Sequence, residues 1–241
     1  MGLFTIKSNE RSGSSVFSDF ASLFFPEYCL GCSSGLVKGE EILCTRCLLD
    51  LPKTNYLNVY ENPIKEKFLG RLPIKYAWAF MKFRKTGVVQ HLLHQLKYNN
   101  KPEVGSRLGK LFGKDIHDLG LASEFDIIIP MPLHHLRQRK RGYNQSTKFA
   151  EGLAQSLNVP SEDNLVTRKI NTSTQTRKNR NERWENVKHA FRVEQPDAIR
   201  NNRILLVDDI ITTGASLEAC GQVLINQGCK ELSFACIAEA Q

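Results

Sequence analysis

The feature of this sequence that most constrains its fold is residues 204–216, with the sequence ILLVDDIITTGAS. The first four residues are apolar, which is typical of a parallel strand that is buried on both faces. Asp208 and Asp209 follow where this strand is expected to end, and a hydroxyl-rich loop then leads into an amphipathic helix. This order predicts a phosphate-binding site, because backbone N–H groups at a helix start point towards a bound anion.

The two aspartates indicate which kind of phosphate compound the predicted site would bind. Asp208 and Asp209 would repel a bare phosphate, but they suit a phosphate carried on a sugar whose hydroxyls need acceptors. Gly214 lets the backbone approach such a ligand closely, and the loop is not a Walker A sequence because it lacks the spaced glycines and the lysine. The alternative is an ordinary turn between strand and helix, in which a Thr or Ser caps the helix.

Four of the seven cysteines form two pairs near the start of the chain. Cys29, Cys32, Cys44 and Cys47 are spaced as C-x2-C, eleven residues, C-x2-C, which predicts one tetrahedral Zn²⁺ held by four thiolates. Redox-active pairs usually occur singly, and disulfides are rare in the cytosol, so these alternatives fit less well. A site closed by four cysteines has no open position for chemistry, and we expect it to be structural.

The chain has 241 residues and a formal net charge of +8, which indicates anionic partners, either a polyphosphate or a nucleic acid. The basic residues cluster within 137–141 and again within 177–183. No apolar run is long enough to span a membrane, and residues 16–25 lack the flanks of a signal peptide. We therefore expect a cytoplasmic protein without membrane insertion.

The pattern of apolar residues predicts an α/β fold in two parts. Residues 1–60 would hold an N-terminal helix, the cysteine module and a connector, and residues 61–241 would form the main domain. There, strands alternate with helices, which indicates a mostly parallel sheet flanked by helices. The strands are expected at 74–83, 125–129, 164–169, 204–207 and 232–237, and the helices at 88–96, 104–112, 145–157 and from Leu217 onwards. Ligands of such sheets bind at the carboxyl ends of strands.

A second anion-binding segment is predicted at residues 130–146, PMPLHHLRQRKRGYNQS, which begins as its strand ends. Its guanidinium groups suit bidentate contact with phosphate oxygens, Gly142 permits a turn, and Asn144 is a candidate helix cap. Residues 172–193 are polar and basic, which favours a mobile flap over the site. Arg183 and Asn186 of this flap are candidates to reach the ligand.

The stretch VDDIITTGAS resembles the ribose 5-phosphate fingerprint of type I phosphoribosyltransferases. The resemblance implies that Asp208 and Asp209 hold the ribose hydroxyls of phosphoribosyl pyrophosphate. It further implies that the 5-phosphate is bound by Thr212, Thr213, Gly214, Ala215 and Ser216. Some members place an acid, a proposed general base, where this chain has Thr212. No catalytic residue is therefore assigned.

Several motifs in one order narrow the family. The chain resembles the ComF/GntX family of competence-associated proteins in five features that occur in one order. They are the four-cysteine head, the strand end P-x-P-L-H, RGYNQ, Q-T-x6-R-x2-N and VDDIITTGAS. The resemblance implies a type I phosphoribosyltransferase fold with a small N-terminal zinc module and a role in natural transformation, alongside other competence proteins. The hypothesis is a phosphoribosyltransferase that binds phosphoribosyl pyrophosphate with Mg²⁺, with its pyrophosphate near Met131, Pro132 and Arg141 and with Arg183 from the flap.

Two other functions stay open from the sequence. One is a single-stranded DNA-binding protein in DNA uptake, because Tyr143 and Trp184 lie between basic residues and aromatic side chains stack on bases. The other is a sensor that binds phosphoribosyl pyrophosphate without turnover, which Thr212 favours. The sequence does not indicate the acceptor of a transfer reaction.

Overall fold

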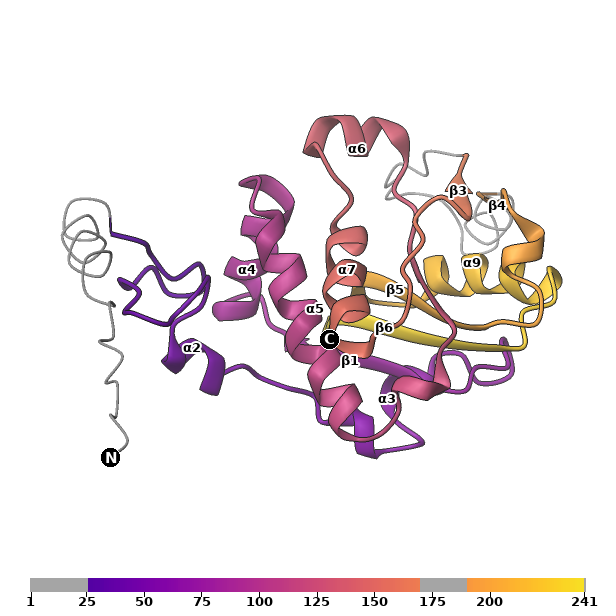
Figure 1. Cartoon of the computed structure of the whole chain (residues 1–241), viewed down its shortest axis with the longest axis horizontal. Helices are drawn as coiled ribbons and strands as arrows, with labels where there is room; N and C mark the ends of the chain where they lie inside the picture. Colours follow the sequence, from indigo (N-terminus) through magenta and orange to yellow (C-terminus); the bar gives the residue numbers. More distant parts are fainter. Residues whose placement is uncertain (1–25, 170–189, 241) are drawn as a thin grey trace, which may run out of the picture.

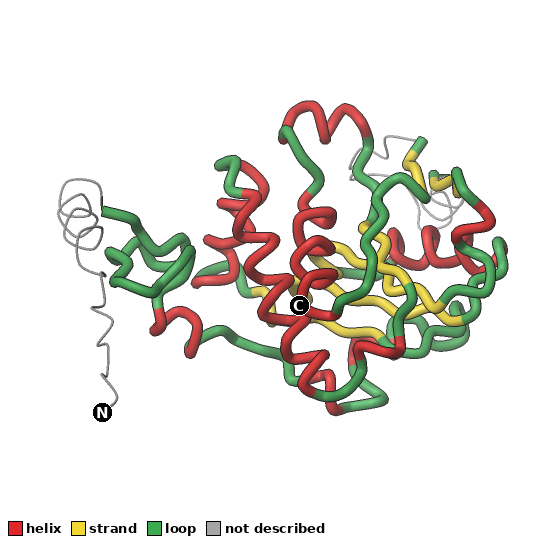
Figure 2. The backbone as a smooth tube through the Cα atoms, in the orientation of Figure 1, coloured by secondary structure: helices red, strands yellow, loops and turns green. Residues whose placement is uncertain are grey.

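A computed structural model describes residues 26–169 and 190–240 of the chain, and at its centre lies a four-stranded parallel sheet. The strands are arranged in the order β1-β6-β5-β2. Figure 1 labels β1, β6 and β5 of this sheet, and Figure 2 draws the strands in yellow. They comprise β1 (Ala77–Phe83), β2 (Ile127–Pro130), β5 (Arg203–Ile211) and β6 (Glu231–Ala240). The parallel sheet predicted from the alternating strands and helices is therefore present.

Helices cover both faces of this sheet (Figure 1). The longer ones are α4 (Val88–Tyr98), α5 (Pro102–Asp118), α6 (His135–Arg141), α7 (Gln145–Leu157) and α9 (Ala215–Asn226). The short ones are α2 (Thr45–Leu49), η1 (Tyr56–Asn58), α3 (Pro63–Glu66), η2 (Ala122–Glu124) and η3 (Pro196–Ala198). Within residues 26–169 and 190–240, no helix is long and apolar enough to cross a membrane.

Two apolar clusters form the core, one on each face of the sheet. The first combines Trp78 and Phe80 of β1 with α4, α5 and α7, and the second combines Ala77 and Ala79 of β1 with α3 and α9. The strand predicted at 74–83 is present as β1, in which large apolar residues alternate with small ones. Both faces of β1 are buried, as expected in a parallel sheet with helices on each side.

Helices α5 and α7 pack with their backbones almost in contact. A Cβ on Gly109 would lie 2.2 Å from the Phe149 carbonyl oxygen, and one on Gly152 would lie 2.1 Å from the Ser106 carbonyl oxygen. Only glycine fits at such a crossing. The close packing buries Phe149 and Leu153 completely, as predicted for this helix, and fixes the position of α7.

The two neighbouring strands β2 and β5 send their chains to opposite faces of the sheet. The chain after β2 leads to α7, which packs in the first cluster, whereas the chain after β5 leads to α9, which packs in the second. The connections diverge beyond the carboxyl ends of these strands. In open α/β sheets this is where a crevice for a ligand forms.

A separate antiparallel pair is formed by β3 (Val166–Arg168) and β4 (Phe191–Val193). The strand predicted at 164–169 is therefore present, but it does not join the parallel sheet. Apart from residues 190–193, the predicted flap at 172–193 lies outside the described residues, as do residues 1–25, where the N-terminal helix was expected.

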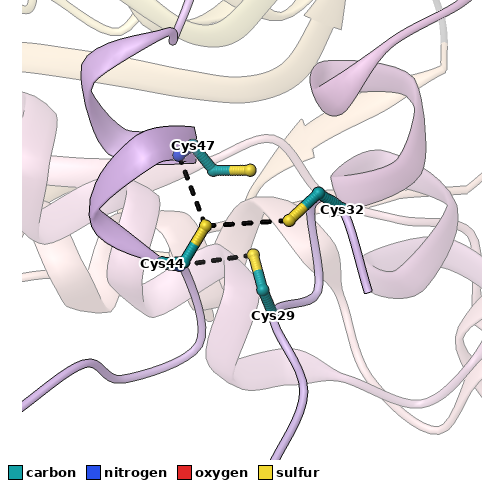
Figure 3. A group of neighbouring side chains, drawn as sticks. All are labelled: Cys29, Cys32, Cys44 and Cys47. Atoms are coloured by element: carbon teal, nitrogen blue, oxygen red, sulfur yellow. Dashed lines mark hydrogen bonds between the residues drawn. The ribbon is translucent and has the colours of Figure 1, made fainter. Parts of the chain in front are cut away.

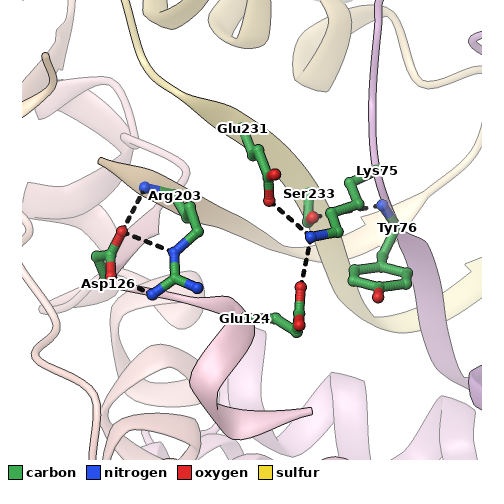
Figure 4. Close-up of polar contacts among 7 residues, drawn as sticks. All are labelled: Lys75, Tyr76, Glu124, Asp126, Arg203, Glu231 and Ser233. Atoms are coloured by element: carbon green, nitrogen blue, oxygen red, sulfur yellow. Dashed lines mark hydrogen bonds and ion pairs between the residues drawn. The ribbon is translucent and has the colours of Figure 1, made fainter. Parts of the chain in front are cut away.

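The amino ends of the strands carry a group of ion pairs (Figure 4). Lys75 lies between Glu124 and Glu231, with 2.8 Å from its Nζ to the Glu231 carboxylate. Asp126, just before β2, accepts hydrogen bonds from the backbone N–H and the guanidinium of Arg203. These five charged residues are thus paired with one another within the protein.

Candidate functional site

Strand β5 does not end at the acidic pair. It continues to Ile211 and pairs with β6 as far as Glu239, which corrects the expectation that Asp208 and Asp209 lie at its end. On its other side, however, the last residue pair with β2 is Pro130 with Val207. The acidic pair therefore lies just past the end of β2. This is the place where the connections after β2 and β5 diverge to opposite faces of the sheet.

The amino end of α7 fills the position beside Asp208. Asn144 caps α7 by accepting a hydrogen bond from the Ser146 N–H, as predicted, and its side chain donates to the Met131 carbonyl oxygen at 3.0 Å. The Ser146 hydroxyl donates to Asp208 Oδ1 at 3.0 Å, and the Asp209 N–H donates to the same oxygen at 2.8 Å. Within the described residues both bonds reach Oδ1, which leaves Oδ2 as an acceptor for a ligand.

The carboxyl group of Asp208 is half-buried and difficult to ionise. Burial, followed by the charge of Asp209, raises the pKa of Asp208 to about 7, although the bonds from Asp209 and Ser146 and the charge of Lys97 act in the opposite direction. A carboxyl group with a pKa near neutrality is common at functional sites. The acid that the sequence places next to a ligand is thus held partly protonated near pH 7.

Asp209 is paired with a lysine from a distant part of the chain. The distance from Lys97 Nζ to Asp209 Oδ2 is 2.8 Å, and each side chain is 17% exposed. Along β5, Leu205 and Val207 face the cluster that contains α4, so side-chain alternation places Asp209 on that same side. The acidic pair is therefore served by two helices, α7 at Asp208 and α4 at Asp209.

The predicted phosphate loop follows β5 directly. Thr212, Thr213 and Ala215 are exposed, Ser216 is half-buried, and Thr213 Oγ1 accepts a hydrogen bond from the Ala215 N–H at 3.4 Å. Gly214 has a φ of +79°, and a Cβ there would lie 2.7 Å from Phe68 Cζ. Glycine is required at this position by both the backbone conformation and the aromatic ring beneath it.

The basic segment after β2 contains a short helix, which the sequence did not indicate. Its basic residues lie on α6, which ends at Gly142 with a φ of +83°. Arg141 Nη1 donates to Gln145 Oε1 at 2.7 Å, and its guanidinium carbon lies 5.8 Å from the centroid of the Tyr98 ring. Arg141 therefore extends towards the end of α4. Met131 and Pro132, predicted near the pyrophosphate, are buried at the end of β2.

The four cysteines lie together, as their spacing predicts (Figure 3). Their sulfur atoms are all within 4.8 Å of one another, and the sulfurs of Cys32 and Cys44 are 3.7 Å apart. All four are free thiols, and tetrahedral Zn²⁺ would place such sulfurs about 3.8 Å apart. Backbone N–H groups of Cys44 and Gly31 donate to the sulfur of Cys29. The cluster fits a closed four-thiolate metal site.

The comparisons with known proteins agree with this arrangement. A family model for the phosphoribosyl transferase domain matches residues 144–241, which begin at the cap of α7 and include the acidic pair and the loop. Competence protein F from Haemophilus influenzae is 31% identical over 153 residues, which are 62% of this chain and 67% of that protein. The chain belongs to the ComF family of phosphoribosyltransferase-like proteins.

Two further relatives carry related names. DNA utilization protein YhgH from Escherichia coli K12 is 31% identical over 61% of this chain and 65% of its own length. Competence protein ComFC from Bacillus subtilis is 30% identical over 42% of this chain and 39% of its own length. The aligned residues thus span about two thirds of the first relatives. The family match and the parallel sheet confirm the predicted type I phosphoribosyltransferase fold.

Several residues of this ComF-family site were not found from the sequence. Lys97 and Ser146 reach the acidic pair from helices whose positions relative to β5 only the fold provides. Arg168 of β3 is half-buried, and desolvation followed by the nearby charge of Arg137 lowers its pKa, while the charge of Asp208 raises it. His134 is buried, which lowers its pKa. The only sequence signal for Lys97 is its place next to buried Leu96, at the border of the apolar stripe of α4.

The structure does not place every predicted residue. Arg183 and Asn186, expected to reach the ligand from the flap, lie outside the described residues, as does Trp184. Tyr143, expected among the basic residues as a stacking aromatic, is instead half-buried and donates its hydroxyl to the Leu96 carbonyl oxygen.

Proposed function

We propose that this ComF-family protein binds phosphoribosyl pyrophosphate with Mg²⁺ at the carboxyl ends of β2 and β5. The observation that carries the proposal is the place of the acidic pair. Asp208 and Asp209 lie where β2 stops, and the hydroxyl-rich loop at 212–216 lies at the start of the next helix. A phosphate and a diol on one small molecule match these two groups.

The residues have separate tasks in this proposal. Asp208 Oδ2 and the carboxylate of Asp209 accept hydrogen bonds from the ribose hydroxyls, and the exposed loop binds the 5-phosphate through its N–H and hydroxyl groups. The pyrophosphate extends towards α6, whose basic residues suit it. These oxygen donors also fit Mg²⁺, which is usually held by one or two carboxylates together with substrate phosphates. The ion supplies charge for the departing pyrophosphate.

Calorimetry with phosphoribosyl pyrophosphate and Mg²⁺ tests this binding. The wild type is expected to bind the sugar only when Mg²⁺ is present, and a variant with both Asp208→Asn and Asp209→Asn is expected to lose measurable affinity. Asp197→Asn is a control, because this aspartate is 96% exposed and lies in η3, which precedes the amino end of β5. Equal affinity of the double variant and the wild type would refute the assignment.

Whether the bound sugar turns over is a separate question. Thr212, where some phosphoribosyltransferases carry an acid, is exposed at the start of the loop. We propose transfer from C1 with loss of pyrophosphate, with stabilisation of the leaving group by cations as the main catalytic effect. Release of pyrophosphate in the presence of candidate bases or DNA supports an enzyme. Tight binding without release across those acceptors supports a sensor.

We also infer that the cysteine cluster binds structural Zn²⁺. Three of the four thiols are buried and the sulfurs lie within one coordination sphere, so four thiolates would fill every position of the ion. Elemental analysis of protein purified without added metal is expected to give one equivalent of zinc. Protein that folds fully with no bound metal would contradict this inference.

A second candidate function, binding of single-stranded DNA during uptake, is favoured by one surface. Tyr98 at the end of α4 is 67% exposed. The ring of His94 lies 5.1 Å from its centroid, and Arg141 lies at the edge of the basic helix α6. Exposed aromatics beside cations stack on bases of single strands. The names of two relatives, a competence protein and a DNA utilization protein, agree with such a role.

Fluorescence anisotropy with a labelled oligonucleotide tests this candidate. Tyr98→Ala is expected to weaken binding about tenfold, since one stacked base contributes roughly that much. Tyr60→Ala is the control, because Tyr60 is 65% exposed and also has a cation over its ring, the Nζ of Lys65 at 3.3 Å. If the affinity for the oligonucleotide changes neither with Tyr98→Ala nor with the salt concentration, this surface does not bind DNA.

A further inference from the structure

We propose that Lys97 is a pyrophosphate-binding residue, which pairs with Asp209 until the hydroxyls of a phosphoribosyl ligand take its place on that carboxylate. This inference rests on the proposed function and names a residue of the same site. The group that Lys97 would bind is the pyrophosphate on C1 of the sugar.

The first step is the ion pair between Lys97 and Asp209. Lys97 Nζ and Asp209 Oδ2 are 2.8 Å apart, and both side chains are only 17% exposed, so each charge is largely shielded from water and is stabilised by the other. A ribose hydroxyl that donates to Asp209 competes with the ammonium for the same oxygens. The displaced ammonium then requires another acceptor, because an unpaired charge at this depth is unfavourable.

The second step is that a lysine can make this exchange without moving the helix. The backbone of α4 is fixed by the buried side chains of Leu92, Leu93 and Leu96, whereas the ammonium is carried on four flexible methylene groups. Lys97 is also in the last turn of α4, where a positive charge is favoured by the helix dipole. The ammonium can therefore swing between two acceptors while the helix stays in place.

The third step identifies which phosphate Lys97 faces. The loop at 212–216 leads into α9, whose buried residues belong to the cluster on one face of the sheet. Lys97 comes from α4, whose buried residues belong to the cluster on the other face. A sugar with its 5-phosphate in the loop thus has its other end towards α4, and this end carries the pyrophosphate.

The fourth step is the contact between the end of α4 and the basic segment. The Tyr143 hydroxyl donates to the Leu96 carbonyl oxygen, and the guanidinium of Arg141 lies over the ring of Tyr98 at 5.8 Å from its centroid. Lys97 is between these two anchored residues in the sequence. The last turn of α4 therefore adjoins the segment whose guanidinium groups suit pyrophosphate. An ammonium on a flexible side chain of that turn would act on the same ligand.

Calorimetry with three probes, each with Mg²⁺, tests the inference: phosphoribosyl pyrophosphate, ribose 5-phosphate and inorganic pyrophosphate. Lys97→Met is expected to weaken phosphoribosyl pyrophosphate about thirtyfold, as for loss of one charge-assisted hydrogen bond, and to weaken pyrophosphate similarly. Ribose 5-phosphate, which lacks the group that Lys97 binds, should change less than about threefold. Lys114→Met is the control, because this lysine also pairs with an aspartate, at 3.0 Å, but is 70% exposed on α5.

The outcomes separate this inference from the proposed function. A wild type that does not bind phosphoribosyl pyrophosphate overturns the proposed function itself. If the wild type binds, equal losses for phosphoribosyl pyrophosphate and ribose 5-phosphate show that Lys97 only holds Asp209, and no loss for either shows that it has no role. Lys97→Gln, which keeps a hydrogen bond to Asp209 without the charge, replaces the methionine variant if the latter melts at a clearly lower temperature.

Discussion

The two ends of the central sheet use charged residues in opposite ways. At the amino end, hydrogen bonds from Arg203 lower the pKa of Asp126 to about 2, and Glu124 and Glu231 raise the pKa of Lys75 (Figure 4). At the carboxyl end, burial raises the pKa of Asp208 to about 7. The protein thus stabilises its ionised groups at one end and holds an acid in an unfavourable environment at the other, which is the pattern expected of a binding site.

The largest expected effect separates affinity from stability at the carboxyl end. Asp208→Asn should weaken phosphoribosyl pyrophosphate about a hundredfold, because a neutral amide replaces the charged acceptor of a ribose hydroxyl. The free energy of unfolding at pH 8 should not fall and should rise, because the neutral amide removes the cost of holding a poorly solvated charge in the folded state. Calorimetry and urea denaturation measure the two quantities, and a parallel loss of both would break the comparison.

The next effect concerns the loop that follows the acids. Gly214→Ala should destabilise the protein by about 2–3 kcal/mol, because the new Cβ meets Phe68 and the backbone has a φ of +79°. Gly120→Ala is matched to it, with a φ of +73° and nothing within 4 Å, and should cost only about 1 kcal/mol. Equal losses in urea denaturation would show that Phe68 does not constrain the loop.

A pH effect follows from the raised pKa of Asp208. The folded state holds this proton more tightly than the unfolded chain, so the contribution of Asp208 to stability falls as the pH rises from about 4 to about 7. Ligand affinity should instead increase as the pH rises over this range, because binding needs the ionised carboxylate. Binding at pH 7 should therefore release about half a proton. Calorimetry in two buffers of different ionisation enthalpy measures this release, and Asp208→Asn should abolish it.

The smallest effect lies at the amino end. Asp126→Asn should lower the free energy of unfolding by about 1 kcal/mol without changing ligand affinity, because Arg203 keeps weaker hydrogen bonds to the amide. Since the pKa of Asp126 is lowered to about 2, its contribution is complete above about pH 4 and is lost as the pH falls towards 2. Urea denaturation from pH 7 to pH 2.5 tests this, and a weakened ligand affinity would contradict the division between the two ends.

Local sequence signals predicted most of the elements and some details of their ends. Asn144 caps α7 and Gly142 ends α6 in a left-handed conformation, as the residue types indicated, since capping depends on neighbours in the chain. The partners of the acidic pair could not be predicted in this way. Lys97 meets Asp209 only because the fold brings the end of α4 within side-chain reach of β5, and β5 extends past the acids beside β6.

Helix α4 joins the cysteine cluster to the acidic pair. Near the start of α4, Val88 packs against Gly31, and His91 Nδ1 lies 3.3 Å from the Gly31 carbonyl oxygen. Gly31 lies between two cysteines of the cluster in the sequence. At the far end of α4, about 14 Å along the helix axis, Lys97 forms its ion pair with Asp209. Helix α4 thus connects the four-cysteine cluster at one end to Asp209 at the other. We expect that disrupting the cluster would also disturb the acidic pair and weaken the sugar binding proposed there.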